Sequence, residues 1–370
     1  MQNTVKQYKT ILAKRNALSH AMGVLNYDSE TAMPKNGAPH MAETMAVLSE
    51  ESYKLQVNDE VRALLEKLNA NSESLDEITR REVEEELKQL KKLENVPIEE
   101  YAAYSRLISE ASVKWREAKQ TNDYPLFKPY LERIIAAQKS LMAHMYPGKD
   151  TYDALLEEFS EGLSVKMLDP FFADVKAKLV PVIHAVCEAG NQADDSLLHR
   201  PFPIEGQRKL SSFVMDFLGI DRDSCVIGEV EHPFTTEFNK HDVRLTTHYH
   251  EDDVLSNMFS VAHEGGHCLY ELNIGDELIG SPLSGGATMT LHESQSRLFE
   301  NMICRSREFI ALLYPKMKEI FPEQMQGVSE EMLYRAANKS MPSLIRTEAD
   351  ELTYCLHIMI RYELEKAFMD

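Results

Sequence analysis

The chain has 370 residues, of which 43% are hydrophobic, and its formal net charge is −20. Nucleic acids and anionic membranes bind clustered lysine and arginine, so such an acidic protein is expected to bind neither of them. There is no apolar signal segment and no long apolar run, and the five cysteines are widely spaced without a C-x-x-C pair, so we expect a cytoplasmic protein without a membrane anchor or a disulfide framework.

In the first part of the chain, residues 1–195, apolar residues recur throughout at the spacing of an amphipathic α-helix. Val83, Leu87, Leu90 and Leu93, for example, recur at helical spacing between charged residues. Turn-forming residues predict helix breaks at PKNGAP (34–39), ENVP (94–97), TNDYP (121–125) and YPGKD (146–150). We therefore expect successive helices here, as the first part of a single domain of residues 1–370.

The second part, residues 196–370, begins with a change of pattern. The stretch 194–206 is irregular and contains prolines, and Cys225 to His250 alternates in the manner of β-strands. In DVRLTTHY (242–249), alternate residues from Asp242 to His248 are polar, and an ordinary half-buried strand explains this face as well as a functional one does. A small sheet is expected here, before a helical period resumes at Asp253.

The stretch VAHEGGHCLYE (261–271) contains an H-E-x-x-H pattern. His263 and His267, four residues apart, share one face of a helix and can reach one metal ion, while Glu264 can contact a metal-bound water without being a ligand. Gly265 and Gly266 each cost the helix roughly 1 kcal/mol, but they let another backbone or a substrate come close. Because the pattern also occurs by chance, a third ligand has to decide between a metal site and a helix that holds two histidines.

The stretch ATMTLHESQSRLFEN (287–301) reads as a further helix, in which Glu293 follows His267 by 26 residues. A glycine-rich loop between the two helices allows the second to return beside the first, so Glu293 is the favoured third ligand. Three protein ligands with an open position are typical of catalytic zinc. Glu271 is the rival ligand, although a third ligand from one helix converges poorly on the ion. Cys268 is expected to face away from the histidines and to be buried.

Near the carboxyl end, SMPSLIRTEADELTY (340–354) places Arg346 and Asp350 four residues apart. Two interpretations stay open. The residues could form an exposed ion pair worth about 0.3–0.5 kcal/mol. Alternatively, Asp350 could hold the guanidinium so that it grips a substrate carboxylate with two parallel hydrogen bonds.

Five stretches, in this order, resemble the sequence blocks of the carboxypeptidase Taq family of zinc metallocarboxypeptidases. They are His232-Pro233-Phe234, Asp242-Val243-Arg244-Leu245-Thr246, His263 to His267, His292-Glu293-Ser294-Gln295 and Ile345-Arg346-Thr347-Glu348-Ala349-Asp350. The similarity extends to residues 26–49 and 152–164 and so covers nearly the whole chain. The family's sixth block, G-x-x-Q-D-x-H-W, is absent from this sequence, and we expect the family's carboxyl-terminal segment to be missing.

The resemblance implies a mainly α fold that is similar to neurolysin and angiotensin-converting enzyme, with a central substrate groove and a small sheet next to the zinc helix. It implies one zinc ion per chain, or else cobalt or another divalent metal, held by His263, His267 and Glu293, with Glu264 as the catalytic carboxylate. The residues implied to bind substrate are Arg346, Arg244 and His232. The residues implied to support the site are Asp242, Thr246, His292, Gln295 and Asp350.

The function implied by the resemblance is release of single amino acids from the free carboxyl terminus of peptides, with broad specificity, by Glu-assisted attack of a metal-bound water. The family also implies a homodimer. The alternative is a shortened or inactive member that binds metal or dimerises without full peptidase activity. Hydrolysis of a blocked dipeptide distinguishes these two possibilities, and metal analysis separates both of them from a helical scaffold with chance histidines that binds no metal.

Overall fold

The computed structural model describes residues 1–190 and 192–369 as fourteen α-helices and three β-strands. The helices are α1 (Gln2–Thr31), α2 (Ala38–Gln56), α3 (Asp59–Asn69), α4 (Glu77–Leu93), α5 (Ile98–Thr121), α6 (Tyr124–Met145), α7 (Thr151–Phe159), α8 (Val165–Glu188), α9 (Ile204–Phe217), α10 (Val254–Leu272), α11 (Met289–Arg297), α12 (Arg307–Ile320), α13 (Glu330–Ala337) and α14 (Glu351–Met369). The strands are β1 (Cys225–Glu229), β2 (Thr235–Asn239) and β3 (Asp242–Thr247). The predicted mainly α class, with a small sheet before the helix that contains the H-E-x-x-H pattern, is confirmed.

The four predicted helix breaks all occur, between α1 and α2, α4 and α5, α5 and α6, and α6 and α7. After α5, Asn122 adopts a φ of 51°, a left-handed conformation that asparagine tolerates better than most residues. Asn58, Asp76 and Asp150 cap the first turns of α3, α4 and α7 by accepting backbone hydrogen bonds. Within the described residues, no helix combines the length and the apolar character that crossing a membrane requires.

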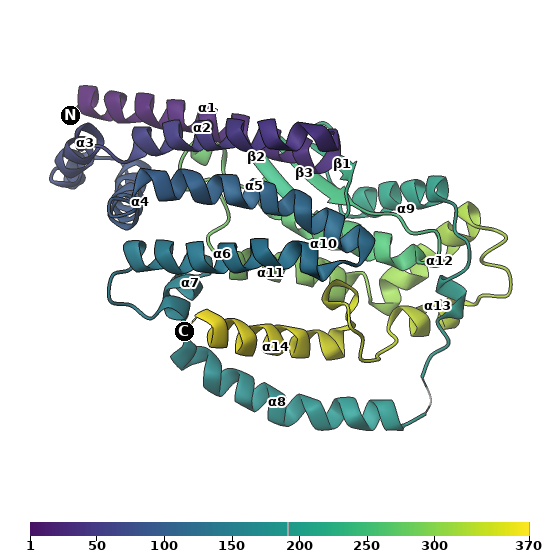
Figure 1. The fold of residues 1–370 in the computed structure, drawn as a ribbon. Coiled ribbons are helices and arrows are strands. Elements are labelled where there is room, and N and C mark those ends of the chain that lie inside the picture. Colours follow the sequence, from purple (N-terminus) through teal and green to yellow (C-terminus); the bar gives the residue numbers. More distant parts are fainter. Residues whose placement is uncertain (191, 370) are drawn as a thin grey trace.

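Helices α1, α2, α5 and α6 form one side of the molecule and pack against one another in this order (Figure 1). Helices α3 and α4 pack at the amino-terminal end of α1, where Leu12, Leu65 and Leu68 belong to a small core. Arg15 of α1 forms an ion pair with the buried Glu86 of α4, which leaves that carboxylate paired inside the protein. From this side, Lys119 at the end of α5 reaches the cavity described below.

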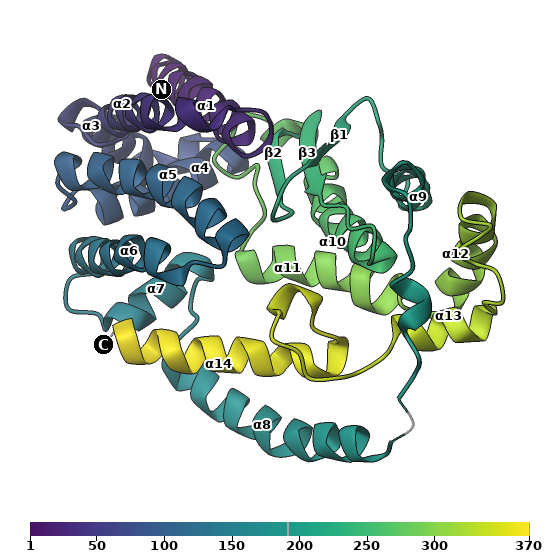
Figure 2. The same cartoon turned by 45° about the vertical axis from the view of Figure 1, so that its right-hand side comes forward.

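The opposite side contains the sheet and the largest hydrophobic core (Figure 2). The strand order is β1-β3-β2, with β3 parallel to β1 and antiparallel to β2. Val243 and Leu245 of β3 are fully buried while Asp242 and Arg244 are only partly buried, as the predicted alternation requires, but Thr246 on the polar face is fully buried as well. Helix α10 packs on β2 and β3, and α9 and α11 pack on α10, so the H-E-x-x-H helix lies between the sheet and the helix that bears Glu293.

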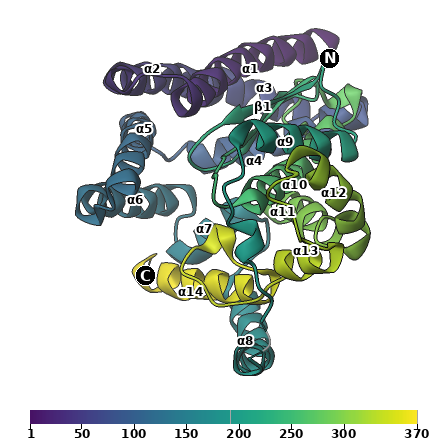
Figure 3. The ribbon, with the colours of Figure 1, turned by 90° about the vertical axis from the view of Figure 1, so that its right-hand side faces the viewer.

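Helix α14 packs against α7 and α8 (Figure 3). Tyr362 and Met369 of α14 share a core with Leu141 of α6 and Tyr152 of α7. Residues from both sides of residue 195 therefore contribute to one core, and the single domain of residues 1–370 stays a prediction. The division of the chain into parts at that residue stays a prediction.

Candidate metal centre

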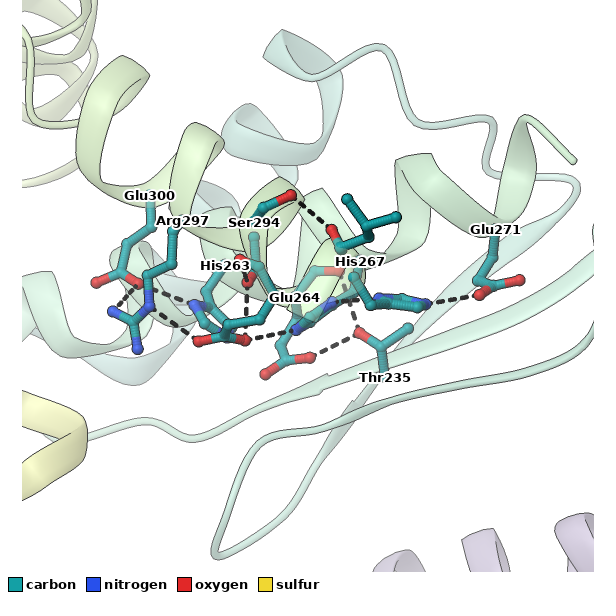
Figure 4. Close-up of polar contacts among 12 residues, drawn as sticks. Thr235, His263, Glu264, His267, Glu271, Ser294, Arg297 and Glu300 are labelled. Carbon is teal, nitrogen blue, oxygen red and sulfur yellow. Dashed lines mark hydrogen bonds and ion pairs between the residues drawn. The ribbon is translucent and has the colours of Figure 1, made fainter. Parts of the chain in front are cut away.

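Helix α10 is held rigidly because most of it is buried. Asp253 caps its first turn, with its side chain accepting a hydrogen bond from the backbone N–H of Ser256 at 3.1 Å. Met258 and Val261 are fully buried in the large core. The rings of His263 and His267 lie beside each other, with centroids 5.1 Å apart, on the part of α10 that α11 covers (Figure 4).

Helices α10 and α11 bring three candidate ligand atoms together. Nε2 of His263 and Nε2 of His267 lie 3.5 and 3.4 Å from Oε2 of Glu293, and a ligand atom from each of the three residues lies within 4.8 Å of the other two. Tetrahedral ligands with bonds of about 2.0–2.1 Å lie roughly 3.3–3.4 Å apart, close to both observed distances. Two imidazole nitrogens and one carboxylate oxygen in this arrangement fit a divalent cation such as zinc.

Glu293 is held in an ionised state. Burial acts to raise its pKa, but contacts with His267, His263 and Arg297 outweigh this effect and lower the pKa of Glu293 to about 2. Nε of Arg297 donates to Oε1 at 2.9 Å, which leaves Oε2 facing the two histidines. Carboxylates bind metal in the deprotonated form, so the state of Glu293 suits a ligand.

The ring of His263 is oriented by a buried carboxylate. Oε2 of Glu300 lies 2.9 Å from Nδ1 of His263, so Nε2 is the nitrogen that faces Glu293. Glu300 belongs to a π-helical segment, Leu298–Ile303, that continues α11, and such segments are frequent at functional sites. Burial acts to raise the pKa of Glu300, but His263, Arg297 and Arg305 lower it overall, so the carboxylate stays charged.

The ring of His267 is oriented differently. Its Nδ1 lies 2.6 Å from Nδ1 of His292, and Nε2 of His292 lies 2.6 Å from Oε1 of Glu271. Glu271, the rival third ligand, therefore points at His292, and the cluster of candidate ligands in the described residues contains Glu293 instead. The hydrogen bond to Glu271 raises the pKa of His292.

Glu264 lies beside the ligand cluster and is 6% exposed. Its Oε2 accepts a hydrogen bond from Oγ1 of Thr235, on β2, at 2.7 Å. Burial raises the pKa of Glu264, although His263 and Thr235 act in the opposite direction. A carboxyl with a raised pKa is well matched to proton transfer near neutral pH, which is the property required of a general base.

The two glycines of α10 allow close packing of other parts of the protein. Of the two predicted neighbours, another backbone or a substrate, the structure shows protein atoms. A Cβ on Gly266 would lie 2.7 Å from the carbonyl oxygen of Gln295 and from Cα of Ser296, both of which are backbone atoms of α11. A Cβ on Gly265 would lie 2.4 Å from Cδ1 of Leu218, at the end of a side chain. Gly266 therefore lets α11 approach closely enough for Glu293 to reach the two histidines.

We expect Gly266→Ala to destabilise the protein by about 1–3 kcal/mol, because an added methyl group in a packed interface forces the backbone of α11 to move. Gly265→Ala is the matched control. It gains the same helix propensity, about 1 kcal/mol, while displacing only a side-chain end. Thermal unfolding measures the difference, and equal stabilities of the two variants would contradict the packing role of Gly266.

A cavity of about 680 Å³ opens over the ligand cluster. Its lining includes Lys119 from the end of α5 on one side, and His232, Glu264, Glu293 and Arg346 on the other. The cavity lies between the end of α5 and the elements that carry the ligand cluster. The groove between two helical sides stays a prediction. Lys119 is neutralised by an ion pair of 3.0 Å with Glu231, so that it is not a free cation in the cavity.

Arg346 lines the cavity, but the predicted contact with Asp350 does not form. Residues 346–348 are a single 3₁₀ turn, and Asp350 instead caps α14, accepting hydrogen bonds from the backbone of Leu352 and Thr353. The prediction that Asp350 pairs with or holds Arg346 was wrong, because the spacing of four residues is helical only if the segment is a helix. The binding of a substrate carboxylate by Arg346 stays a prediction. The hydrogen-bond partner of Arg346 is the hydroxyl of Tyr354, at 3.2 Å.

His232 also lines the cavity, with its ring at an edge-to-face angle to Trp115 and the centroids 6.2 Å apart. Burial lowers the pKa of His232, and the positive charge of Arg346, which lines the same cavity, lowers it further. A cavity lined by a neutral imidazole and a guanidinium is suited to an anionic group.

The remaining predicted residues do not line the cavity. Arg244 forms two hydrogen bonds of 2.9 Å with Asp242, and its guanidinium stacks over Tyr27 and Phe238. Thr246 is fully buried and bonds the backbone of Phe234, which fixes the turn before β2. Among the described residues, the side chain of Gln295 forms a hydrogen bond with Ser294 alone. Their roles at the site stay predictions.

Two neighbours of the site, Glu300 and Thr235, were missed from the sequence. Glu300 follows Glu293 by seven residues and thus returns to the same face of a helix, a spacing that could have indicated it. Thr235 directly follows His232-Pro233-Phe234, but no local pattern shows that β2 carries it to Glu264.

Comparison with known proteins finds relatives over nearly the whole chain. Residues 7–370 match the family model of the carboxypeptidase Taq metallopeptidases. Carboxypeptidase 1 of Bacillus subtilis is 40% identical over 362 residues, which are 98% of this chain and 72% of that protein. The BsuCP crystal structure has a TM-score of 0.97 at 40% identity, covering 99% of this chain and 74% of that one. A carboxypeptidase crystal structure from Deinococcus radiodurans has a TM-score of 0.89 at 32% identity, covering 99% of this chain and 73% of that one.

Proposed function

The chain belongs to the carboxypeptidase Taq family of metallopeptidases and is a metallocarboxypeptidase, and on this premise we propose that it releases single amino acids from the free carboxyl terminus of peptides with broad specificity. His263, His267 and Glu293 hold one divalent metal ion in this proposal, with zinc as the favoured metal. The observation that carries the proposal is the convergence of Nε2 of both histidines on Oε2 of Glu293, with Glu264 beside them.

In the proposed mechanism, a divalent ion at this position supplies the Lewis-acid chemistry that hydrolysis of a peptide bond needs. Glu264 accepts a proton from the attacking water and returns it to the leaving amine. Thr235 holds Oε2 of Glu264 by its hydrogen bond, which fixes one oxygen of a carboxylate that lines the cavity together with His263. The burial of Glu264 keeps bulk water from competing for the transferred proton.

Arg346 is proposed to bind the carboxylate of the substrate. Arg297 and Arg305, which also line the cavity, bond to Glu300, whereas no described carboxylate forms an ion pair with Arg346. An unpaired guanidinium in a cavity is suited to bidentate binding of a carboxylate. His232 lies beside it as a second polar group. Arg244 stays a weaker candidate because Asp242 already accepts hydrogen bonds from its Nε and one of its Nη atoms.

The proposed exopeptidase specificity is tested with Arg346→Ala. We expect kcat/KM on a blocked dipeptide with a free carboxylate to fall by roughly 10- to 100-fold, because a hydrogen bond to a charged group contributes about 1.5–3 kcal/mol. The amidated analogue should be a poor substrate for the wild type and should change little in the variant. Metal content should stay the same.

Arg244→Ala is the matched control for this experiment, since it removes an arginine that is bonded within its own strand. The proposal predicts a smaller loss than for Arg346→Ala. An equal fall on free and amidated peptides, or no fall for Arg346→Ala, would contradict the assignment of Arg346 to the substrate carboxylate.

The proposal includes three further expectations, namely zinc as the metal, a homodimer as the assembly and the cytoplasm as the compartment. All five cysteines are free, which is compatible with a reducing environment. Sedimentation of the purified protein tests the assembly, with a mass of two chains expected.

A further inference from the structure

The contact between His267 and His292 involves two ring nitrogens, which limits where protons can be. Nδ1 of His267 and Nδ1 of His292 lie 2.6 Å apart, so one nitrogen donates a hydrogen and the other accepts it. On its other side, His292 places Nε2 at 2.6 Å from Oε1 of Glu271, which is 3% exposed. An ionised carboxylate only accepts, so Nε2 of His292 is the donor in that contact.

These contacts can order the protons in only one way that leaves Nε2 of His267 free for a metal. Nε2 of His292 donates to Glu271, Nδ1 of His292 accepts from Nδ1 of His267, and the lone pair of His267 is then on Nε2, which faces Glu293. If the hydrogen bond between the rings ran in the opposite direction, Nε2 of His267 would carry a hydrogen and could not be a ligand.

We propose that Glu271 and His292 are positioning residues, which hold His267 in the tautomer and orientation that bind metal. The inference rests on the proposed metal site and extends it to two residues that do not themselves bind the ion. His263 is held by Glu300 directly, at 2.9 Å, whereas His267 depends on two side chains in series. Partners of this kind typically change metal affinity by about 10- to 100-fold when they are removed.

The surrounding residues give His292 little freedom to turn. Its ring meets Tyr270 edge to face, with centroids 4.9 Å apart. On another side, a Cβ added to Gly286 would lie 2.4 Å from Cδ2 of His292 and 2.9 Å from Cε1 of Tyr270. Gly286 therefore provides the space that the ring of His292 needs. Its neighbour Gly285 has no atom within 4 Å of such a Cβ, so the two glycines form a matched pair for experiment.

The test measures the dissociation constants of Zn²⁺ and Co²⁺ for the full chain by competition with a chromophoric chelator. His292→Phe should weaken binding by about 10- to 100-fold. His292→Asn should restore most of the affinity, because its amide oxygen can accept from Nδ1 of His267 where Phe cannot. Gly286→Ala should weaken binding in the same direction as His292→Phe, while Gly285→Ala should match the wild type. The visible spectrum of bound Co²⁺ should change in His292→Phe and should stay close to that of the wild type in His292→Asn.

Unchanged metal affinity in His292→Phe would overturn the inference. An equal loss of affinity in His292→Asn and His292→Phe would overturn it as well, because a residue that acts by packing alone needs no hydrogen-bond acceptor for Nδ1 of His267. Thermal unfolding of the metal-free proteins shows which variants fold. If His292→Phe does not fold, the comparison of Gly286→Ala with Gly285→Ala tests the inference in its place. A wild type that binds no metal would overturn the proposed function itself, whereas failure of the inference requires a wild type that binds.

Discussion

Replacing Glu264 by glutamine is expected to lower kcat on a blocked dipeptide by about 100- to 10,000-fold, the usual contribution of a positioned general acid or base. Glutamine cannot accept and return the proton, although its amide oxygen can still accept the hydrogen bond from Thr235. Because Glu264 is buried and its pKa is raised, the neutral amide should not destabilise the fold. Metal content should equal that of the wild type.

Glu348→Gln is the control for this experiment, since it removes the same charge from another residue of the cavity lining that lies outside the ligand cluster. We expect a much smaller effect on kcat for this variant. Turnover of Glu264→Gln near the wild-type rate, with metal bound, would contradict the assignment of Glu264 as the general base.

Replacing Glu293 by glutamine is expected to weaken metal binding by more than about 100-fold. Removing an anionic ligand should lower the metal affinity more than removing a residue that only holds a ligand, for which the effect is about 10- to 100-fold. Peptide hydrolysis should fall in parallel and recover partly when excess metal is added. Arg297 loses its ion pair with residue 293 in this variant, but the amide oxygen can still accept its hydrogen bond and the contact of 3.0 Å with Glu300 remains, so the local structure should persist. Equilibrium dialysis with metal analysis measures the effect.

Glu319→Gln, on the exposed surface of α12, removes an equal charge away from the centre and should leave metal binding unchanged. A full complement of metal in Glu293→Gln, with an affinity near that of the wild type, would show that another residue is the third ligand.

Much of the fold follows from local sequence patterns. Turn residues located the four helix breaks of the first part of the chain, because proline, glycine and asparagine act on their immediate neighbours. The alternation around Val243 and Leu245 located β3, since its apolar face is buried in a core. The spacing of His263 and His267 was sufficient to place both rings on one face of α10.

Features that depend on packing between distant segments were harder to predict. Arg346 and Asp350 have helical spacing, yet the chain there forms a 3₁₀ turn and Asp350 caps the next helix. Glu271 was considered as a ligand, whereas the return of α11 places His292 against it. The approach of α11 is permitted by Gly266, and a single glycine does not reveal which backbone will fill the space beside it.

The most direct test of the central claim is a crystal structure of the metal-loaded protein, with anomalous scattering recorded at the zinc absorption edge. We predict one anomalous peak per chain, about 2.0–2.2 Å from Nε2 of His263, Nε2 of His267 and a carboxylate oxygen of Glu293. The absence of a peak at this position, or an ion coordinated by Glu271 in place of Glu293, would contradict the account.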